Sequence, residues 1–298
     1  MAWLQVIVTA PQEKAPVYAD FLSDFGAVSV TFQDAKDEPI YEPALNTTPL
    51  WQHTTVIALY SAETDIEPLK IKLKTILDPQ TFSTLKIEPL EDKNWVELWR
   101  NEFKPMHFGH DLWIYPNDTE IPNSKNITAI RLDPGMAFGT GTHPTTRLCL
   151  EWLAAHPPKD YLVIDYGSGS GILAIAALKL GAKFVYAVDY DPQALTSTTE
   201  NAKQNSYDEH KILALSPEGL TLLKPEPCDL ILANILLNPL MELRDHFISL
   251  LKPKGVLVVS GVLETQVPLL VEHYQAQSLF EVVEVCVLEE WARVTLSR

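Results

Sequence analysis

Cysteine is scarce in this sequence of 298 residues: only Cys149, Cys228 and Cys286 occur, and they lie far apart. An odd number of cysteines at such spacings forms neither a disulfide framework nor the paired C-x-x-C ligands of a zinc site. His107 and His110 also lack further ligand residues nearby, so we predict no metal site. Buried, reduced cysteines are typical of a cytoplasmic protein, which is the location we expect.

Long apolar runs are also lacking. No run approaches the roughly 18 residues that a membrane-spanning helix requires, and residues 1–10 have no basic stretch of the kind that begins a signal peptide. We therefore expect no membrane association. Hydrophobic residues make up 46% of the chain and charged residues 21%, which indicates a globular protein with room for one or two domains.

Basic residues are outnumbered. The chain has 23 lysines and arginines against 39 aspartates and glutamates, which gives a formal net charge of −16. Such a charge opposes direct binding to nucleic-acid phosphates and favours a basic partner. An acidic surface that serves only solubility is the alternative interpretation.

The most informative glycines lie within residues 163–171, which read VIDYGSGSG. Apolar residues lead into an acid, and Gly167, Gly169 and Gly171 follow at every second position before a helix-like run from Ile172. This pattern predicts a buried strand, a tight turn and a helix N-terminus, which together make a nucleotide-type cofactor site. A plain connection between a strand and a helix is the alternative.

The cofactor follows from the details of this turn. The dinucleotide pattern G-x-G-x-x-G is absent because its sixth position is Ile172. Asp165, just before the turn, would repel a pyrophosphate but would suit a ligand that carries an ammonium and a sulfonium group. S-adenosylmethionine is such a ligand, and we predict it as the cofactor.

The order of elements predicts two domains. Residues 1–92 give the order β-α-β-β-α-β of a ferredoxin-like α+β fold and hold no catalytic constellation, so we interpret them as a recognition module rather than a purely structural appendage. Residues 93–105 predict an amphipathic linker helix. Residues 106–298 alternate strands and helices, which predicts a doubly wound parallel sheet.

The end of the chain refines the fold class. The strands that we expect at residues 280–288 and 292–296 are joined by too few residues for a parallel crossover, so they must pair antiparallel. A seven-stranded sheet with an antiparallel last strand resembles the fold of class I S-adenosylmethionine-dependent methyltransferases. We therefore expect an α/β fold with this doubly wound methyltransferase sheet, preceded by a small ferredoxin-like domain.

Four segments together resemble the ribosomal protein L11 methyltransferase family. They are LDPGMAFGTGTHPTT at residues 132–146, VIDYGSGSGILAIAA at 163–177, AVDYDP at 187–192 and ANIL at 233–236. Many methyltransferases share the glycine turn, whereas the loop before it is much more specific. The resemblance extends over essentially the whole chain. It implies that the small domain grips a ribosomal protein of the large subunit, whose lysine side chains and N-terminal amine the larger domain methylates.

The resemblance implies that Thr146, Gly167, Asp189 and Asn234 contact the cofactor. Asp189 ends the strand after the glycine turn, 22 residues beyond Gly167, where a carboxylate can accept both ribose hydroxyls. Thr146 could donate its hydroxyl to the cofactor from the loop that precedes its helix. His143, in that loop, is a better candidate for a bracing hydrogen bond than for a proton acceptor.

Asn234 is the residue that we expect at the reacting centre. Methyl transfer to nitrogen requires a neutral amine, and neutralising a lysine of pKa ~10.4 at pH 7 costs ~4.6 kcal/mol. An amide oxygen can accept an amine N–H and aim the nitrogen lone pair, whereas a carboxylate would stabilise the unreactive ammonium. Proximity and alignment should supply most of the remaining catalysis.

Three other functions stay open at this point. The chain could methylate another protein or a small amine, or it could be a non-catalytic ribosomal-protein binder that has kept the fold. A nucleotide-cofactor dehydrogenase is the third alternative, and both Ile172 and the antiparallel final strands disfavour it.

Overall fold

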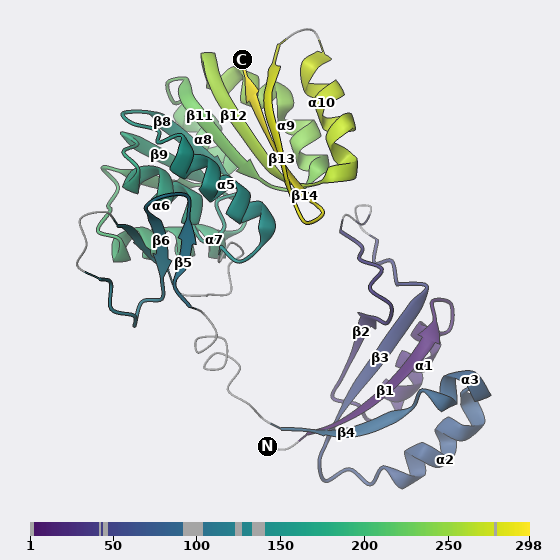
Figure 1. Cartoon of the computed structure of the whole chain (residues 1–298). Coiled ribbons are helices and arrows are strands. Elements are labelled where there is room, and N and C mark those ends of the chain that lie inside the picture. The colour runs from purple at the N-terminus through teal and green to yellow at the C-terminus, as the bar shows by residue number, and fades with distance from the viewer. Residues whose placement is uncertain are drawn as a thin grey trace. The chain divides into compact units, whose positions relative to one another are not determined.

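The computed structural model describes residues 3–41, 43, 47–91, 104–122, 127–132, 141–276 and 279–298. The chain divides into two compact units, Met1–Trp95 and Val96–Arg298 (Figure 1). The linker helix predicted over residues 93–105 lies almost entirely outside the described residues, so that part of the domain assignment stays a prediction. None of the described helices is long and apolar enough to cross a membrane.

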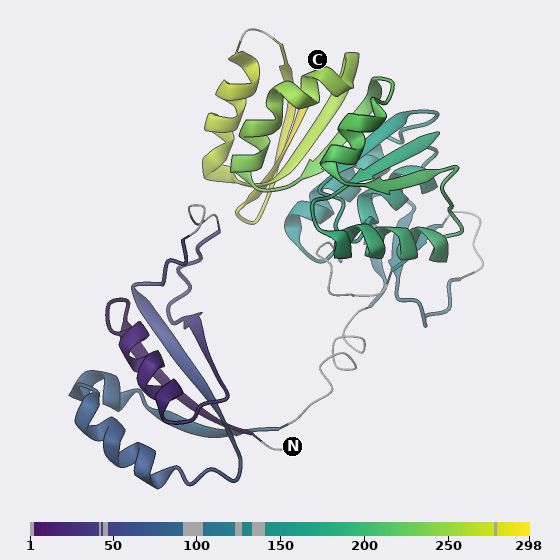
Figure 2. The ribbon, with the colours of Figure 1, turned by 180° about the vertical axis from the view of Figure 1, so that it is seen from behind.

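The first unit has the predicted ferredoxin-like order of elements, with one short helix added. Its antiparallel sheet has the strand order β2-β3-β1-β4 (Figure 2). The elements are β1 (Trp3–Pro11), α1 (Ala15–Asp24), β2 (Ser29–Asp34), β3 (His53–Ser61), α2 (Glu67–Ile76), α3 (Pro79–Ser83) and β4 (Lys86–Leu90). Alternate residues of β1 and β3 are buried and share one hydrophobic cluster with residues of α1 and α2, so both helices cover the same face of the sheet.

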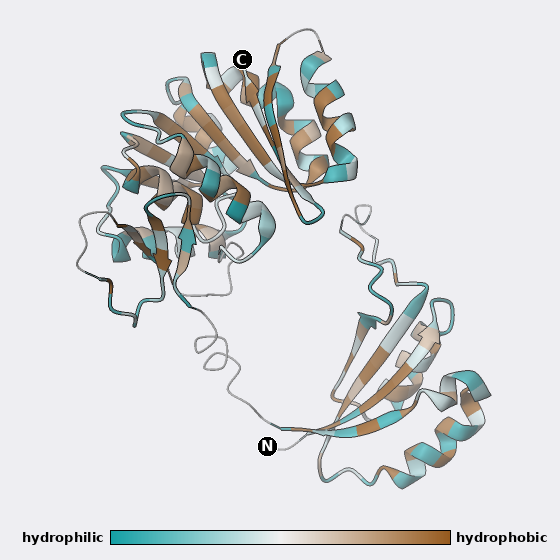
Figure 3. Cartoon of the chain, viewed as in Figure 1, coloured by the Kyte–Doolittle hydropathy of each residue, from teal (hydrophilic) through white to brown (hydrophobic). Residues whose placement is uncertain are grey.

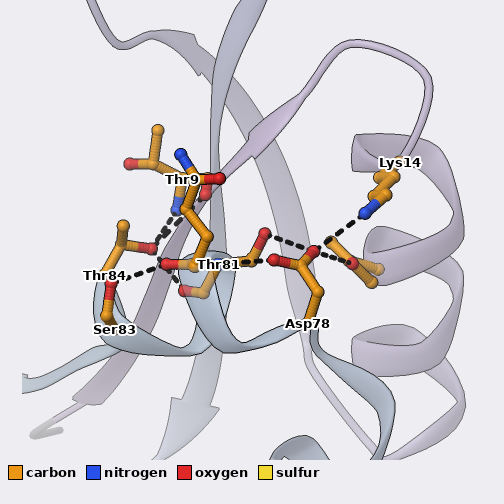
Figure 4. Close-up of polar contacts among 8 residues, drawn as sticks. Thr9, Lys14, Asp78, Thr81, Ser83 and Thr84 are labelled. Carbon is orange, nitrogen blue, oxygen red and sulfur yellow. Dashed lines mark hydrogen bonds and ion pairs between the residues drawn. The ribbon is translucent and has the colours of Figure 1, made fainter.

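Asp78 connects α3 to α1 (Figure 4). It is the N-cap of α3, because its Oδ1 atom accepts the backbone N–H of Thr81 at 3.0 Å. Its Oδ2 atom accepts hydrogen bonds from the Lys14 ammonium at 2.9 Å and the Tyr18 hydroxyl at 3.2 Å. The Thr81 N–H and Lys14 favour the carboxylate, so they hold the pKa of Asp78 well below its usual range.

Replacing Asp78 by alanine should therefore destabilise the first unit. Because the folded-state pKa of Asp78 is depressed, its contribution to stability is present above the unfolded pKa of about 3.9 and is lost as the pH falls below that value. Urea unfolding of the wild type and of Asp78→Ala, followed at about pH 7 and about pH 3, should show the larger difference at the higher pH. An equal difference at both pH values would contradict this role of the carboxylate.

The second unit contains the predicted seven-stranded sheet, in the order β10-β9-β8-β11-β12-β14-β13. Strand β14 pairs antiparallel with both β12 and β13, whereas the other neighbouring pairs are parallel, as predicted. The strands are β8 (Leu162–Tyr166), β9 (Phe184–Val188), β10 (Ile212–Leu215), β11 (Cys228–Asn234), β12 (Leu251–Leu263), β13 (Glu281–Leu288) and β14 (Trp291–Ser297). The expectation of an antiparallel end to a doubly wound sheet is confirmed.

Helices cover both faces of this sheet. They are α5 (Pro144–Ala155), α6 (Ile172–Lys179), α7 (Pro192–Gln204), α8 (Pro217–Leu223), α9 (Leu237–Leu250) and α10 (Val267–Gln275), with a short 3₁₀ turn η1 (Glu264–Gln266). Apolar residues concentrate in the strands and on the helix sides that face the sheet (Figure 3). Helix α6 is buried nearly all round because it packs against α5 and β7 as well as the sheet.

A second, three-stranded sheet packs beside α5 and α6. It consists of β5 (Met106–Phe108), β6 (Leu112–Tyr115) and β7 (Thr128–Arg131), in that order. The sequence predicts a strand pair at residues 112–115 and 128–132. The pair is present as β6 and β7 and is parallel, and β5 adds an antiparallel edge. The sequence predicts a helix that starts at Asn238-Pro239 and a turn at residues 252–255. Both predictions are wrong in the structure, because α9 begins at Leu237 and residues 252–255 belong to β12.

Candidate active site

The glycine turn after β8 has the backbone geometry that its sequence predicts. Gly167, Gly169 and Gly171 have φ values of +82°, +53° and +79°, a region that L-residues with a Cβ atom avoid. A Cβ atom on Gly167 would lie 2.3 Å from Cγ2 of Ile235, and one on Gly171 would lie 2.9 Å from Cγ2 of Thr198. The turn is therefore fixed by close packing as well as by its dihedral angles.

A cavity of about 290 Å³ opens at the carboxyl ends of β8, β9 and β11. This is the edge at which open α/β sheets bind ligands. The cavity brings together four of the residues predicted from the sequence, Gly167, Gly169, Asp189 and Asn234. Its remaining lining residues were not predicted; they are Tyr166, Tyr190, Ile235, Pro239 and Leu243.

Asp189 and Asp191 accept hydrogen bonds from different parts of the backbone. The carboxylate of Asp189 accepts the backbone N–H of Gly169 at 2.9 Å and that of Asp191 at 3.0 Å. Asp191 is the N-cap of α7 and accepts the N–H of Gln193 at 2.8 Å. A carboxylate has about four acceptor positions, so Asp189 can hold the glycine turn and still accept hydrogen bonds from a ligand in the cavity.

Asn234, the last residue of β11, has a fixed side-chain amide. Its Nδ2 atom donates to Oγ1 of Thr146 at 3.2 Å, and Thr146 is fully buried in the first turn of α5. Its Oδ1 atom is buried and has no hydrogen-bond partner in the described part of the chain. Leaving such a buried acceptor unpaired costs about 1–3 kcal/mol. Asn234 thus combines a place in the cavity lining with a buried amide oxygen whose hydrogen-bonding capacity is unused.

Comparisons with known proteins give the family. The family model for "Ribosomal protein L11 methyltransferase (PrmA)" matches residues 2–298. The chain belongs to the ribosomal protein L11 methyltransferase family. Relatives of that name in Hydrogenovibrio crunogenus and Actinobacillus succinogenes are 45% and 48% identical to it, over 100% and 99% of this chain and 99% of each relative.

A solved structure agrees with this family assignment. The ribosomal protein L11 methylase of Lactobacillus delbrueckii subsp. bulgaricus is 34% identical and superposes with a TM-score of 0.59, over 66% of this chain and 99% of that one. The family resemblance drawn from the four sequence segments is therefore confirmed. Most of the threonine- and glycine-rich loop, residues 133–140, lies outside the described residues.

Two of the predicted cofactor-binding residues, Gly171 and Thr146, are not among the described residues that line the cavity. Gly171 is the left-handed N-cap of α6 and packs against Thr198. Thr146 acts on the cavity through the amide of Asn234. Direct contact of either residue with a cofactor stays a prediction.

His143 braces the start of α5, as the sequence favours. It is the N-cap of the helix, where its Nδ1 atom accepts the N–H of Thr145 at 3.3 Å. Its ring packs edge-on against Trp291, with ring centres 4.9 Å apart. Burial lowers the pKa of His143 and so favours the neutral ring, in which Nδ1 keeps the lone pair that the cap requires.

Asp165 differs from its predicted role. It is fully buried and accepts the N–H of Ala174 at 2.9 Å, and it does not line the described cavity. Its Oδ1 atom has no hydrogen-bond partner among the residues that the structure describes. Burial raises the pKa of Asp165 to about 7, although the Ala174 N–H acts in the opposite direction. The family member therefore carries a carboxyl that is partly protonated near neutral pH, so electrostatic selection of a cationic ligand by this group is weaker than predicted.

Stability should reflect this buried carboxyl. Because the folded-state pKa of Asp165 lies above the unfolded value of about 3.9, stability is lost as the pH rises through about 7. We expect the wild type to lose about 2 kcal/mol relative to Asp165→Asn between about pH 5.5 and pH 8.5. Urea unfolding of both proteins at the two pH values measures this difference. A wild type that gains stability relative to the variant as the pH rises would contradict it.

Proposed function

We propose that this protein transfers methyl groups from S-adenosylmethionine to lysine side-chain and N-terminal amines of ribosomal protein L11. The observation that carries this proposal is the buried, unpaired Oδ1 atom of Asn234, a residue that lines the cavity at the end of β11. Membership of the L11 methyltransferase family supports the reaction and the substrate.

The cavity fits the proposed cofactor in three respects. Gly167 and Gly169 line it without side chains, so the methionine part can lie against their backbone. The remaining acceptor positions of the Asp189 carboxylate suit the two ribose hydroxyls. Tyr190, Pro239 and Leu243 give the cavity an apolar part, which suits a purine ring. When bound, the cofactor supplies an electrophilic methyl group on a sulfonium.

The task of the protein is to present a neutral amine nitrogen to that methyl group. Asn234 can accept an amine N–H at Oδ1, because the hydrogen bond from its Nδ2 atom to Thr146 directs the oxygen away from α5. An uncharged acceptor orients the nitrogen lone pair without stabilising the ammonium form, whose neutralisation at pH 7 costs ~4.6 kcal/mol for a free lysine. Alignment in the cavity then accounts for most of the rate.

The first unit supports a role in recognition of the substrate. Its described residues form a sheet that is covered on one face by helices. We propose residues 1–92 as the substrate-recognition domain, 93–105 as the linker helix and 106–298 as the methyltransferase domain. The formal charge of −16 favours a basic ribosomal protein over direct contact with nucleic acid, and a cytoplasmic location follows from such a substrate.

Incubation of the purified chain with labelled S-adenosylmethionine and purified L11 tests this proposal. We expect label in L11, and mass spectrometry of its peptides should place methyl groups on lysine and N-terminal amines. A whole ribosomal extract, included in parallel, would reveal another protein substrate. Bound cofactor without label in any protein would instead indicate a non-catalytic binder or a small amine substrate, and would contradict the proposal.

Asn234→Ala removes the amide that we place at the reacting centre. We expect kcat to fall by about 100-fold or more, since an interaction made with the reacting group is lost. Asn234→Asp should be similarly impaired, because a carboxylate stabilises the ammonium. Single-turnover methylation of L11 at saturating cofactor gives the rates, and Asn238→Ala, an exposed change in the first turn of α9, is the control. Unchanged rates in both Asn234 variants would remove this residue from the site.

Thr146→Val tests the orientation of the amide separately. The substitution keeps the buried volume nearly constant but leaves Nδ2 of Asn234 without the acceptor that holds it at 3.2 Å. We expect a rate loss of about 10-fold, smaller than that of Asn234→Ala, because the amide is still present but less well aligned. The methylation assay on L11 measures it. A larger loss than in Asn234→Ala would indicate a direct catalytic or cofactor contact of Thr146.

A further inference from the structure

Strand β12 contains a bulge close to the cavity. Ser260 pairs with Arg293 and Val262 pairs with Ala292, so Gly261 is the extra residue between these two pairs. Its φ value is +86°, which only glycine adopts readily. The Oγ atom of Ser260 donates to the carbonyl oxygen of Ala292 at 2.9 Å and fixes the bulge to β14.

The bulge lies directly against the residue that follows Asn234. A Cβ atom on Gly261 would lie 2.4 Å from the carbonyl oxygen of Ile235, 2.8 Å from its carbonyl carbon and 3.1 Å from its nitrogen. These are backbone atoms, so no change of rotamer can relieve the clash. On the other side, Gly167 has room for the Ile235 side chain only because it lacks a Cβ atom.

We propose that Gly261 is a positioning residue that sets the place of Asn234 in the cavity. Strand β11 lies between β8 and β12 in the sheet. At the end of β11, the segment Asn234-Ile235 therefore passes between two glycines: Gly167, which follows β8, and Gly261, which lies in β12. Any side chain on Gly261 pushes the Ile235 backbone away, and Asn234 is covalently attached to it.

The consequence for catalysis rests on the proposed function. A displacement of about 1 Å at a reacting centre can cost about 100-fold in rate. Gly169 and Asp189, which line the cavity on the side of β8 and β9, are held by their own hydrogen bond, whereas a Cβ atom on Gly261 would meet the backbone of Ile235. A change at Gly261 should therefore affect transfer of the methyl group far more than binding of the cofactor.

Gly261→Ala is the direct test. We expect a loss in kcat of about 30- to 100-fold, with the Kd of S-adenosylmethionine within about 5-fold of the wild type. Gly261→Asn separates two causes: asparagine tolerates positive φ better than alanine but carries the same Cβ atom, so it should lose rate to a similar extent. Recovery of the full rate in Gly261→Asn would show that backbone strain alone matters, and would overturn the proposal.

Gly255→Ala is the matched control in the same strand. Its Cβ atom would also be crowded, at 2.6 Å from Cγ of Leu251 and 2.9 Å from the carbonyl oxygen of Lys252, but it lies at the opposite end of β12. It should destabilise the protein without a selective loss of kcat. An equal loss of kcat in Gly255→Ala and Gly261→Ala would show a general effect of crowding and would also overturn the proposal.

A readout independent of activity separates this inference from the proposed function. The side-chain amide signal of Asn234 in a ¹⁵N NMR spectrum is the one missing from Asn234→Ala. It should shift in Gly261→Ala and stay in place in Gly255→Ala. If the wild type methylated no amine at all, the proposed function would fail, whereas an unmoved Asn234 signal in Gly261→Ala would defeat the positioning role.

If the Gly261 variants do not fold, Ser260→Ala tests whether the bulge positions Asn234. It removes the hydrogen bond to Ala292 that fixes the bulge and adds no atom. We expect a folded protein with a shifted Asn234 amide signal and a loss in kcat of about 3- to 10-fold. Wild-type kcat together with an unshifted signal would overturn the proposal.

Discussion

The hydrogen bond from the Asn234 amide to Thr146 joins the two parts of the chain on which the site depends. Asn234 ends β11 and Thr146 lies in the first turn of α5, 88 residues earlier in the sequence. The bond gives the amide one orientation, and the amide oxygen of this cavity-lining residue is buried without a hydrogen-bond partner among the described residues. Helix α5 is in turn fixed at its start by the His143 cap and by the packing of that ring against Trp291 of β14. The final antiparallel strand thus supports the proposed reacting centre as well as the sheet.

Close backbone packing is the second constraint, and it explains where glycine is needed. The turn after β8 and the bulge in β12 both place a glycine with positive φ against Ile235. Parallel strands bring their carboxyl ends to one edge, but strands alone do not determine the position of the residue that leaves each end. Two missing Cβ atoms, one on each side of β11, give the Asn234-Ile235 segment a defined path.

Much of this could be predicted from the sequence because the signals are local. An acid or an amide at the end of a predicted strand indicated Asp189 and Asn234 as cavity residues. The short connection between the last two strands predicted that they pair antiparallel. The roles of Thr146 and Gly261 could not be predicted, since both depend on which residues meet across strands far apart in the chain. The burial of Asp165 is likewise a property of the packed fold, and it changes the charge that the sequence alone assigns to this residue.

The charges around the Asn234 amide determine why a neutral group suits the role of acceptor for the substrate amine. An unpaired buried carbonyl costs about 1–3 kcal/mol, and this cost is relieved when an amine N–H binds. Neutralising a lysine costs ~4.6 kcal/mol at pH 7, and every nearby carboxylate would raise that figure. Burial keeps Asp165 partly protonated, and the Asp189 carboxylate already accepts two backbone N–H groups. The acidic character of the whole chain can therefore attract a basic protein at long range. Close to the proposed reacting centre, a neutral acceptor does not stabilise the ammonium form of the amine that has to lose its proton.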